Sequence, residues 1–333
     1  MMKNEVLLEA RDIVKYYDVV ARGILTRKSV GLVHAVDHVS FKVKKGETLA
    51  LVGESGCGKT TTGKVILNLE APTDGQVFFE EMDVFKTFKS GKASEKLKLR
   101  RSMQLVFQNP YLSLDPRMTV YDILSEPFVI HKHIPKKDWD DRVYRLLEMV
   151  GLEAYHAERY PHEFSGGQRQ RLSIARALAV DPKFIIADEP VSSLDVSIRA
   201  QILNLMAHLQ EENQISYLYI SHDLGSVRQI SHRVAVMYLG EIVELAATDD
   251  LFSKPLHPYT QALMSAVPIP NPSSNTGRII LPGEVPSPVN PPDGCRFNPR
   301  CPYAQEICRT TKPSFENVKG EHWVSCHFWQ KFT

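Results

Sequence analysis

The most chemically informative stretch of the sequence is a glycine-rich run that ends in a lysine and a threonine. Residues 53–60 read Gly-Glu-Ser-Gly-Cys-Gly-Lys-Thr, after the apolar run TLALV and before the helical pattern TTGKVILNLE. This arrangement is typical of a P-loop, in which backbone N–H groups and a helix N-terminus surround phosphate oxygens. Lys59 would contact the β and γ phosphates, and the Thr60 hydroxyl is placed to ligate Mg²⁺. The predicted phosphate site comprises Gly53, Glu54, Ser55, Gly56, Cys57, Gly58, Lys59, Thr60 and Thr61.

Two adjacent acids end a second apolar run. Asp188 and Glu189 follow the residues Phe-Ile-Ile-Ala at 184–187. Carboxylates at the carboxyl end of a strand lie in the crevice where doubly wound sheets bind ligands. Asp188 is therefore predicted to hold Mg²⁺, and Glu189 to polarise the attacking water. Alone, such a pair is more often a helix N-cap or a solvated edge, but the P-loop in the same chain favours the catalytic interpretation.

The elements that must position these residues follow an alternating pattern over the first 250 residues. Short β-branched runs alternate with amphipathic stretches, which is typical of an α/β fold with helices on a parallel sheet. Strands are predicted over 48–53, 183–188 and 216–221. Between the first two, one helix is expected to face the core with residues spaced i, i+3, i+4 and i+7, namely Val143, Leu146, Leu147 and Val150.

The composition changes after about residue 254, where NPSS, LPGEVPSP and NPPDG predict a linker or an extended wrap. Four cysteines follow with the spacing C-x5-C-x6-C-x17-C, at Cys295, Cys301, Cys308 and Cys326. A tail this short builds a poor apolar core, and four thiolates suffice for zinc or an iron–sulfur cluster. The spacing does not choose between them. Basic residues among the cysteines would offset the charge of a cluster or form a solvated surface, and these are Arg296, Arg300, Arg309 and Lys312.

Bulk composition limits the function. Forty Lys and Arg face 39 Asp and Glu, a formal net charge of +1, so the chain has no global positive field for a nucleic-acid backbone. Its apolar runs fall short of the about 20 residues that a spanning helix needs. Residues 1–12 also lack the apolar core of a secretory signal. We therefore expect a cytoplasmic protein that crosses no membrane and binds no nucleic acid.

The order of the motifs resembles that of the ATP-binding cassette (ABC) family. Residues 164–171, Phe-Ser-Gly-Gly-Gln-Arg-Gln-Arg, look like the signature motif of that family. The P-loop, Gln108, this signature, the two acids, the SSLD run at 192–195 and His222 follow one another in the family's order. The resemblance implies a P-loop ABC-type nucleotide-binding domain over residues 1–254. That domain would contain a RecA-like core, an antiparallel β subdomain and a helical subdomain at about 109–180.

The resemblance also implies a role for each motif. The signature would contact a nucleotide bound to a partner subunit, so that two ATP molecules lie between two cassettes. Gln108 would sense Mg²⁺ and the attacking water, and His222 would contact the γ phosphate and position that water. Tyr17 resembles the adenine-stacking aromatic residue, with Tyr16 as the neighbouring candidate and strand packing as the alternative. The nucleotide contacts implied in this way are Tyr17, Gln108, Ser165, Gly166, Gly167, Gln168, Asp195 and His222.

A narrower resemblance covers nearly the whole chain. Residues 109–120 (NPYLSLDPRMTV), 257–263 (HPYTQAL) and the cysteine tail look like the ATPase subunits of dipeptide and oligopeptide importers. This implies a peripheral ATPase on the cytoplasmic face of the membrane, paired with a second, often non-identical ATPase. Two permease subunits and an external peptide-binding protein complete the implied assembly. The extension at 255–333 would carry a 4Fe-4S cluster on its four cysteines, with zinc as the alternative metal.

Two other function classes are alternatives to peptide import. One is an ABC protein that acts on nucleic acid or ribosomes, and the near-zero net charge and the importer-type tail count against it. The other makes the tail an iron–sulfur interaction or sensor module and the ATPase secondary. Co-purification from membranes would separate these classes, because permease partners would be recovered only for an importer.

Overall fold

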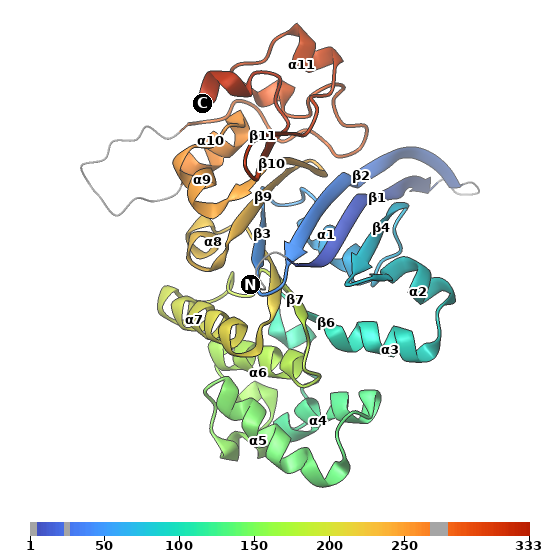
Figure 1. The fold of residues 1–333 in the computed structure, drawn as a ribbon, viewed down its shortest axis with the longest axis vertical. Coiled ribbons are helices and arrows are strands. Elements are labelled where there is room, and N and C mark those ends of the chain that lie inside the picture. The colour runs from blue at the N-terminus through green and yellow to red at the C-terminus, as the bar shows by residue number, and fades with distance from the viewer. Residues whose placement is uncertain (1–4, 23–26, 267–278) are drawn as a thin grey trace. The chain divides into compact units, whose positions relative to one another are not determined.

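The computed structural model describes residues 5–22, 27–266 and 279–333 (Figure 1). Residues 1–4 and the NPSS stretch at 271–274 lie outside this range. Within it, no helix is both long and apolar enough to span a bilayer. The chain forms two compact units that alternate along the sequence. The first unit contains residues 5–8, 43–48 and 78–221, and the second contains the described residues of 9–42, 49–77 and 222–333.

Parallel strands form the centre of the first unit. β6 (Met103–Val106) pairs with β7 (Phe184–Asp188), which pairs in turn with β8 (Ser216–Ser221), and both pairings are parallel. Every residue of β7 and β8 is buried, as expected for parallel strands that are covered on both faces. The predictions of strands at 183–188 and 216–221 are confirmed to within one residue.

Helices fill the chain of the first unit between β6 and β7. They include α4 (Val120–His131), α5 (Trp139–Met149) and α6 (Gly166–Leu178), drawn in green in Figure 1. α4 begins with a capping box between Thr119 and Asp122, which satisfies two of its free N–H groups. The stripe predicted on α5 is fully buried at Val143, Leu146, Leu147 and Val150. The unit also contains β5 (Met82–Asp83), α2 (Val84–Ser90), α3 (Ala93–Ser102) and α7 (Val196–Asn213).

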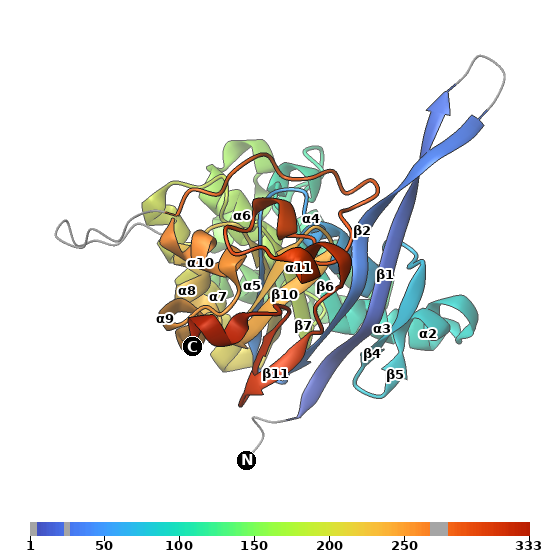
Figure 2. The ribbon, with the colours of Figure 1, turned by 90° about the horizontal axis from the view of Figure 1, so that it is seen from above.

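A mixed sheet runs through the second unit. β3 (Thr48–Val52) lies parallel to β9 (Arg233–Tyr238), and β10 (Glu241–Ala247) returns antiparallel to β9. The C-terminal tail extends this sheet, because β12 (His322–Val324) pairs antiparallel with β10, and β11 (Glu316–Lys319) with β12. Figure 2 labels β10 and β11 at this edge, and β12 pairs between them. The tail is thus attached to the sheet by strand addition, a contact that was not predicted from the sequence.

The second unit also contains long strands and several short helices. β2 (Arg27–Lys44), β1 (Val6–Arg22) and β4 (Asp74–Phe79) are neighbours in that order in another sheet. The proline-rich segment lies against β2, where His34 N–H donates to the carbonyl of Pro288 at 3.0 Å, so it is an extended wrap, as predicted. The helices are α1 (Lys59–Ile66), α8 (Leu224–Ile230), α9 (Thr248–Ser253), α10 (Pro258–Ser265) and α11 (Glu306–Thr310).

Candidate nucleotide-binding site and cysteine cavity

The P-loop of the second unit joins β3 to α1 through positions that require glycine. Gly53, Gly56 and Gly58 have φ angles of 153°, 79° and 108°, a region that other residues rarely adopt. A Cβ on Gly53 would lie 2.1 Å from the carbonyl oxygen of Met237, and one on Gly58 would lie 2.0 Å from that of Ala35. The predicted order of strand, glycine turn and helix is present, with Gly58 as the N-cap of α1.

The Lys59 side chain lies against this loop. Its Nζ donates to the carbonyl oxygens of Gly53 at 2.8 Å and Glu54 at 3.0 Å, and it is 3.8 Å from Cys57 Sγ. These contacts fix a positive charge inside the loop, where the sequence predicts phosphate. Burial raises the pKa of the Cys57 thiol, so this sulfur is a neutral packing group. The next residue of α1, Thr60, is exposed at the end of the loop.

The two candidate adenine-stacking residues have different surroundings. The Tyr16 hydroxyl donates to Asp37, and the Tyr16 ring centroid lies 4.2 Å from that of His34. Tyr17 is 36% exposed, and its hydroxyl donates to Glu70 and also contacts Thr61, which follows the P-loop. Burial of the phenol and the Glu70 carboxylate raise the pKa of Tyr17 to about 12. Tyr17 is therefore the tyrosine that combines an open side chain with a contact to α1.

Two groups predicted to take part in hydrolysis meet at the carboxyl end of β7 in the first unit. Gln108 Nε2 donates to Glu189 Oε2 at 2.9 Å. Glu189 has a φ of 47°, in the left-handed region, and its N–H donates to the carbonyl of Ile220 at 2.9 Å. Asp188 ends the strand with 8% exposure. A nearly buried carboxylate and an amide-bound carboxylate thus follow one another at a strand end.

The signature residues form the N-terminus of α6. Ser165 is the N-cap, and its Oγ accepts from Gln168 N–H at 3.3 Å while its own N–H donates to Gln168 Oε1 at 3.0 Å. A Cβ on Gly167 would lie 2.4 Å from Ile198, so a larger residue there would displace α7. Asp195 caps α7, accepting from Ile198 N–H at 3.0 Å, and this bond lowers the pKa of the Asp195 carboxyl. Asp195 therefore has a capping role that the sequence analysis did not assign to it.

The predicted nucleotide-binding residues fall into two sets. The P-loop, Tyr17 and His222 belong to the second unit, in which His222 is exposed directly after the last residue of β8. Gln108, the signature, Asp188, Glu189 and Asp195 belong to the first unit. The sets alternate along the chain, because each unit is assembled from separate stretches of sequence.

The four tail cysteines line one small cavity. Cys295, Cys301, Cys308 and Cys326 surround a space of about 20 Å³, together with aromatic residues that include Phe297. All four are free thiols, and burial raises the pKa of Cys295 to about 12 and that of Cys326 to about 11. Among the described residues, no three Cys, His, Asp or Glu side chains converge as metal ligands. The predicted metal site is therefore not confirmed, because the thiols share a cavity without closing around one point.

Sequence reasoning missed the partners of the arginines in the tail. Arg296 pairs with Asp37, and Arg300 Nη1 donates to Glu54 Oε2 at 2.9 Å. The two arginines are only 7% and 8% exposed, so they do not form a solvated surface. Their charges are balanced by carboxylates, which leaves them unavailable to offset a cluster. No local pattern in the sequence indicates these pairs, because Arg300 and Glu54 are 246 positions apart.

Comparison with known proteins agrees with these motifs. The family model described as ABC transporter matches residues 36–192, and that described as oligopeptide/dipeptide transporter, C-terminal region, matches residues 243–308. The oligopeptide transport ATP-binding protein AppF of Bacillus subtilis is 51% identical over 98% of both chains. The dipeptide transport ATP-binding protein DppF of Escherichia coli is 48% identical over 95% of this chain and 92% of its own.

A solved structure supports the fold. A dimeric ATP-binding cassette in a post-hydrolysis state, bound to ADP and Pi, is 28% identical to this chain, with a TM-score of 0.62. The match covers 72% of this chain and 98% of that one. The match therefore leaves part of this chain without a counterpart in that structure.

Proposed function

The chain belongs to the ABC transporter ATP-binding proteins of oligopeptide and dipeptide transport, and we propose that its motif residues bind and hydrolyse ATP. The protein is an ATPase that energises the import of dipeptides or oligopeptides. The observation that carries the proposed site is the hydrogen bond from Gln108 to Glu189, beside the nearly buried Asp188. An amide that holds one carboxylate next to another is suited to orient a water for attack on phosphate.

Different residues of this chain contact different parts of the nucleotide. The P-loop amides and Lys59 hold the phosphates, and the exposed face of Tyr17 stacks on the adenine. Mg²⁺, when bound with ATP, neutralises phosphate charge, and its protein ligands would be Thr60, Asp188 and Gln108. Glu189 accepts the proton of the attacking water, and His222 contacts the γ phosphate.

The test of the hydrolytic residue is Glu189→Gln in the purified chain. We expect ATP binding within about threefold of the unchanged protein and a loss of hydrolysis of at least about a hundredfold, because an amide cannot accept the proton. Glu148→Gln, an exposed glutamate of α5, is the matched control and should hydrolyse ATP normally. Normal turnover by Glu189→Gln would remove Glu189 as the general base.

The proposed partners are a second ABC ATPase, identical or homologous, and two membrane permease subunits fed by an extracytoplasmic peptide-binding protein. In the dimer, Ser165, Gly166, Gly167 and Gln168 would face the nucleotide of the other subunit. Support for the permease contact comes from a cavity of about 510 Å³ whose lining includes Tyr111, Leu114, Arg117 and Arg176. It is formed largely by the segment 109–120 whose sequence resembles that of importer ATPases. The protein would then be peripheral at the cytoplasmic face, with an ATPase domain at 1–254 and an extension at 255–333.

A 4Fe-4S cluster on the four cysteines stays a proposal, with zinc as the alternative. The donor set fits, because the four thiols line one cavity. A cavity of about 20 Å³ exceeds the about 10–15 Å³ that one water needs, so the space between the thiols does not exclude a bound group. Anaerobically purified protein should be brown and contain iron if the proposal holds. Colourless protein with stoichiometric zinc would support the alternative, and metal-free protein would exclude both.

A further inference from the structure

The P-loop residue Glu54 is held by two side chains from the last quarter of the chain. Its backbone N–H donates to the Tyr259 hydroxyl at 2.9 Å, and its carboxylate accepts from Arg300 Nη1 at 2.9 Å. Tyr259 is fully buried and Arg300 is 8% exposed. The bond to Tyr259 ends on a buried hydroxyl, and the pair with Arg300 is partly shielded, since the Glu54 side chain is 28% exposed.

These two anchors are themselves rigidly packed. The rings of Tyr238, Tyr259 and Phe297 form a cluster, with centroids 4.7 Å apart for the two tyrosines and 5.3 and 5.5 Å from each tyrosine to Phe297. The Tyr238 hydroxyl also contacts the Arg300 side chain. The Arg300 guanidinium thus lies beside a packed aromatic cluster and makes its hydrogen bond to Glu54.

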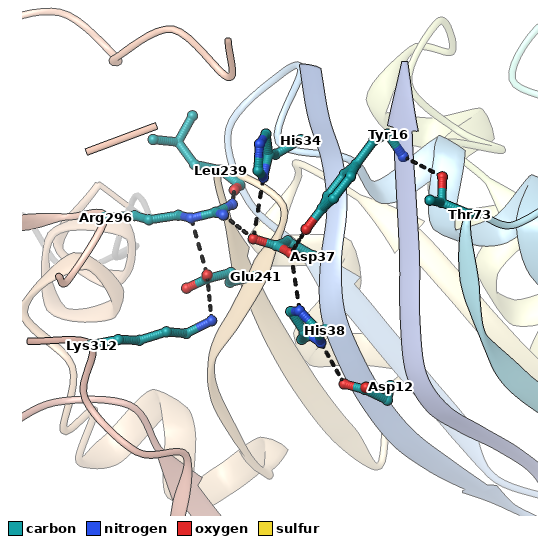
Figure 3. A network of polar contacts seen from close by, with 10 residues as sticks. All are labelled: Asp12, Tyr16, His34, Asp37, His38, Thr73, Leu239, Glu241, Arg296 and Lys312. Carbon is teal, nitrogen blue, oxygen red and sulfur yellow. Dashed lines mark hydrogen bonds and ion pairs between the residues drawn. The ribbon is translucent and has the colours of Figure 1, made fainter. Parts of the chain in front are cut away.

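A second arginine, Arg296, connects the extension to Asp37 in β2 (Figure 3). Arg296 donates to Asp37 and to the Leu239 carbonyl, and its Nε lies 3.0 Å from Glu241 Oε1. Asp37 also accepts from the hydroxyl of Tyr16, the neighbour of the proposed adenine-stacking residue. The extension therefore contacts the P-loop through Arg300 and the partner of Tyr16, Asp37, through Arg296.

Both arginines belong to one short turn of the cysteine tail. Arg296 follows Cys295, and Arg300 ends the 3-10 helix η5 (Asn298–Arg300) immediately before Cys301. Backbone bonds fix their spacing, from Asn298 N–H to the Cys295 carbonyl at 2.9 Å and from Arg300 N–H to the Phe297 carbonyl at 3.0 Å. A displacement of this turn would move both arginines.

We propose that Arg300 is a positioning residue of the ATPase, which holds the P-loop for nucleotide through Glu54, so that the C-terminal extension helps to set ATP affinity. The inference rests on the proposed ATP site. Without Arg300, Glu54 would place an uncompensated negative charge in the loop that receives the phosphates. The loop would also lose one of two anchors that pre-order its backbone.

The experiment compares Arg300→Ala, Arg300→Lys and the control Arg309→Ala by calorimetric titration with ATP and Mg²⁺, and by steady-state hydrolysis. Arg309 is also basic and follows a tail cysteine, but it is exposed. We expect Arg300→Ala to raise Kd and KM about tenfold with kcat within about twofold, because a lost pre-ordering contact weakens binding. Arg300→Lys should recover part of the loss, and Arg309→Ala should bind like the unchanged chain.

The variant Glu54→Gln provides a second, independent test of whether Arg300 acts through Glu54. It removes the carboxylate charge and keeps the side-chain shape, so adding Arg300→Ala to it should change Kd less than about twofold. A tenfold loss in that background would overturn the proposal, since the arginine would then act through another group. Equal Kd for Arg300→Ala and the unchanged chain would also overturn it. Absence of ATP binding by the unchanged chain would instead refute the proposed function itself.

Discussion

Replacement of the buried Glu244 tests whether the C-terminal extension is held by contacts made within this chain. Glu244 lies in β10 with no exposed surface. Its carboxylate accepts from Leu256 N–H at 2.7 Å and from His257 N–H at 2.9 Å, and it lies 2.7 Å from Nε2 of His322 in β12. One side chain thus ties the start of the extension and its last strand to the sheet.

The cost of Glu244→Ala follows from these partners. Two backbone N–H groups would be left buried without an acceptor, at about 1–3 kcal/mol each. A cavity would add to this loss, while relief from burying a charge would offset part of it. We expect a net destabilisation of about 3 kcal/mol. With a urea m-value of about 2 kcal/mol/M, the unfolding midpoint should fall by about 1.5 M.

The assay is urea unfolding followed by tryptophan fluorescence. Two of the three tryptophans, Trp323 and Trp329, lie in the extension, so the signal reports mainly on this region. Glu244→Gln keeps one acceptor oxygen and should fall between the alanine variant and the unchanged chain. Glu284→Ala, an exposed glutamate of the same extension, is the matched control and should not shift the midpoint. A midpoint for Glu244→Ala that equals the control would refute the reasoning.

Three further predictions follow from the described contacts. Gly58→Ala should abolish measurable ATP binding in a titration, because its Cβ would lie 2.0 Å from the Ala35 carbonyl oxygen, and a folded, ATP-binding variant would contradict this. Burial raises the pKa of Asp37, but the hydrogen bond from the Tyr16 hydroxyl and the Arg296 guanidinium outweigh burial and lower that pKa below 3.8. The ionised Asp37 carboxylate therefore stabilises the fold above pH 3.8, and this stabilisation is lost as the pH falls below that value. Asp37→Asn should therefore lose less stability between pH 5 and pH 3 than the unchanged chain, as measured by acid unfolding, and an equal loss would count against the assignment. Leu146→Ala, at a fully buried position of α5, should lower the free energy of unfolding by about 2–5 kcal/mol in urea titrations followed by circular dichroism.

Most of the predicted strands and helices follow from local patterns in the sequence. The strand before the P-loop, the strand that ends in Asp188 and the buried face of α5 follow from runs of apolar residues and their spacing. The short strands β11 and β12 were not predicted, because they have only four and three residues and depend on pairing, β12 with β10 and β11 with β12. This pairing attaches the tail to the sheet, a contact that no pattern in the sequence indicated.

What the sequence by itself determined is the family and the candidate phosphate-binding residues. The glycines, Lys59 and the Asp188–Glu189 pair are read from neighbouring residues, since backbone geometry and charge act there over a few positions. Tertiary structure alone decided which distant residues contact the P-loop residue Glu54. Arg300 and Glu54 are 246 positions apart, and Tyr259 and Glu54 are 205 apart, so no periodicity or spacing connects them. Such pairs are fixed only when the sheet of the second unit brings the extension against the loop, because packing rather than local propensity chooses their partners.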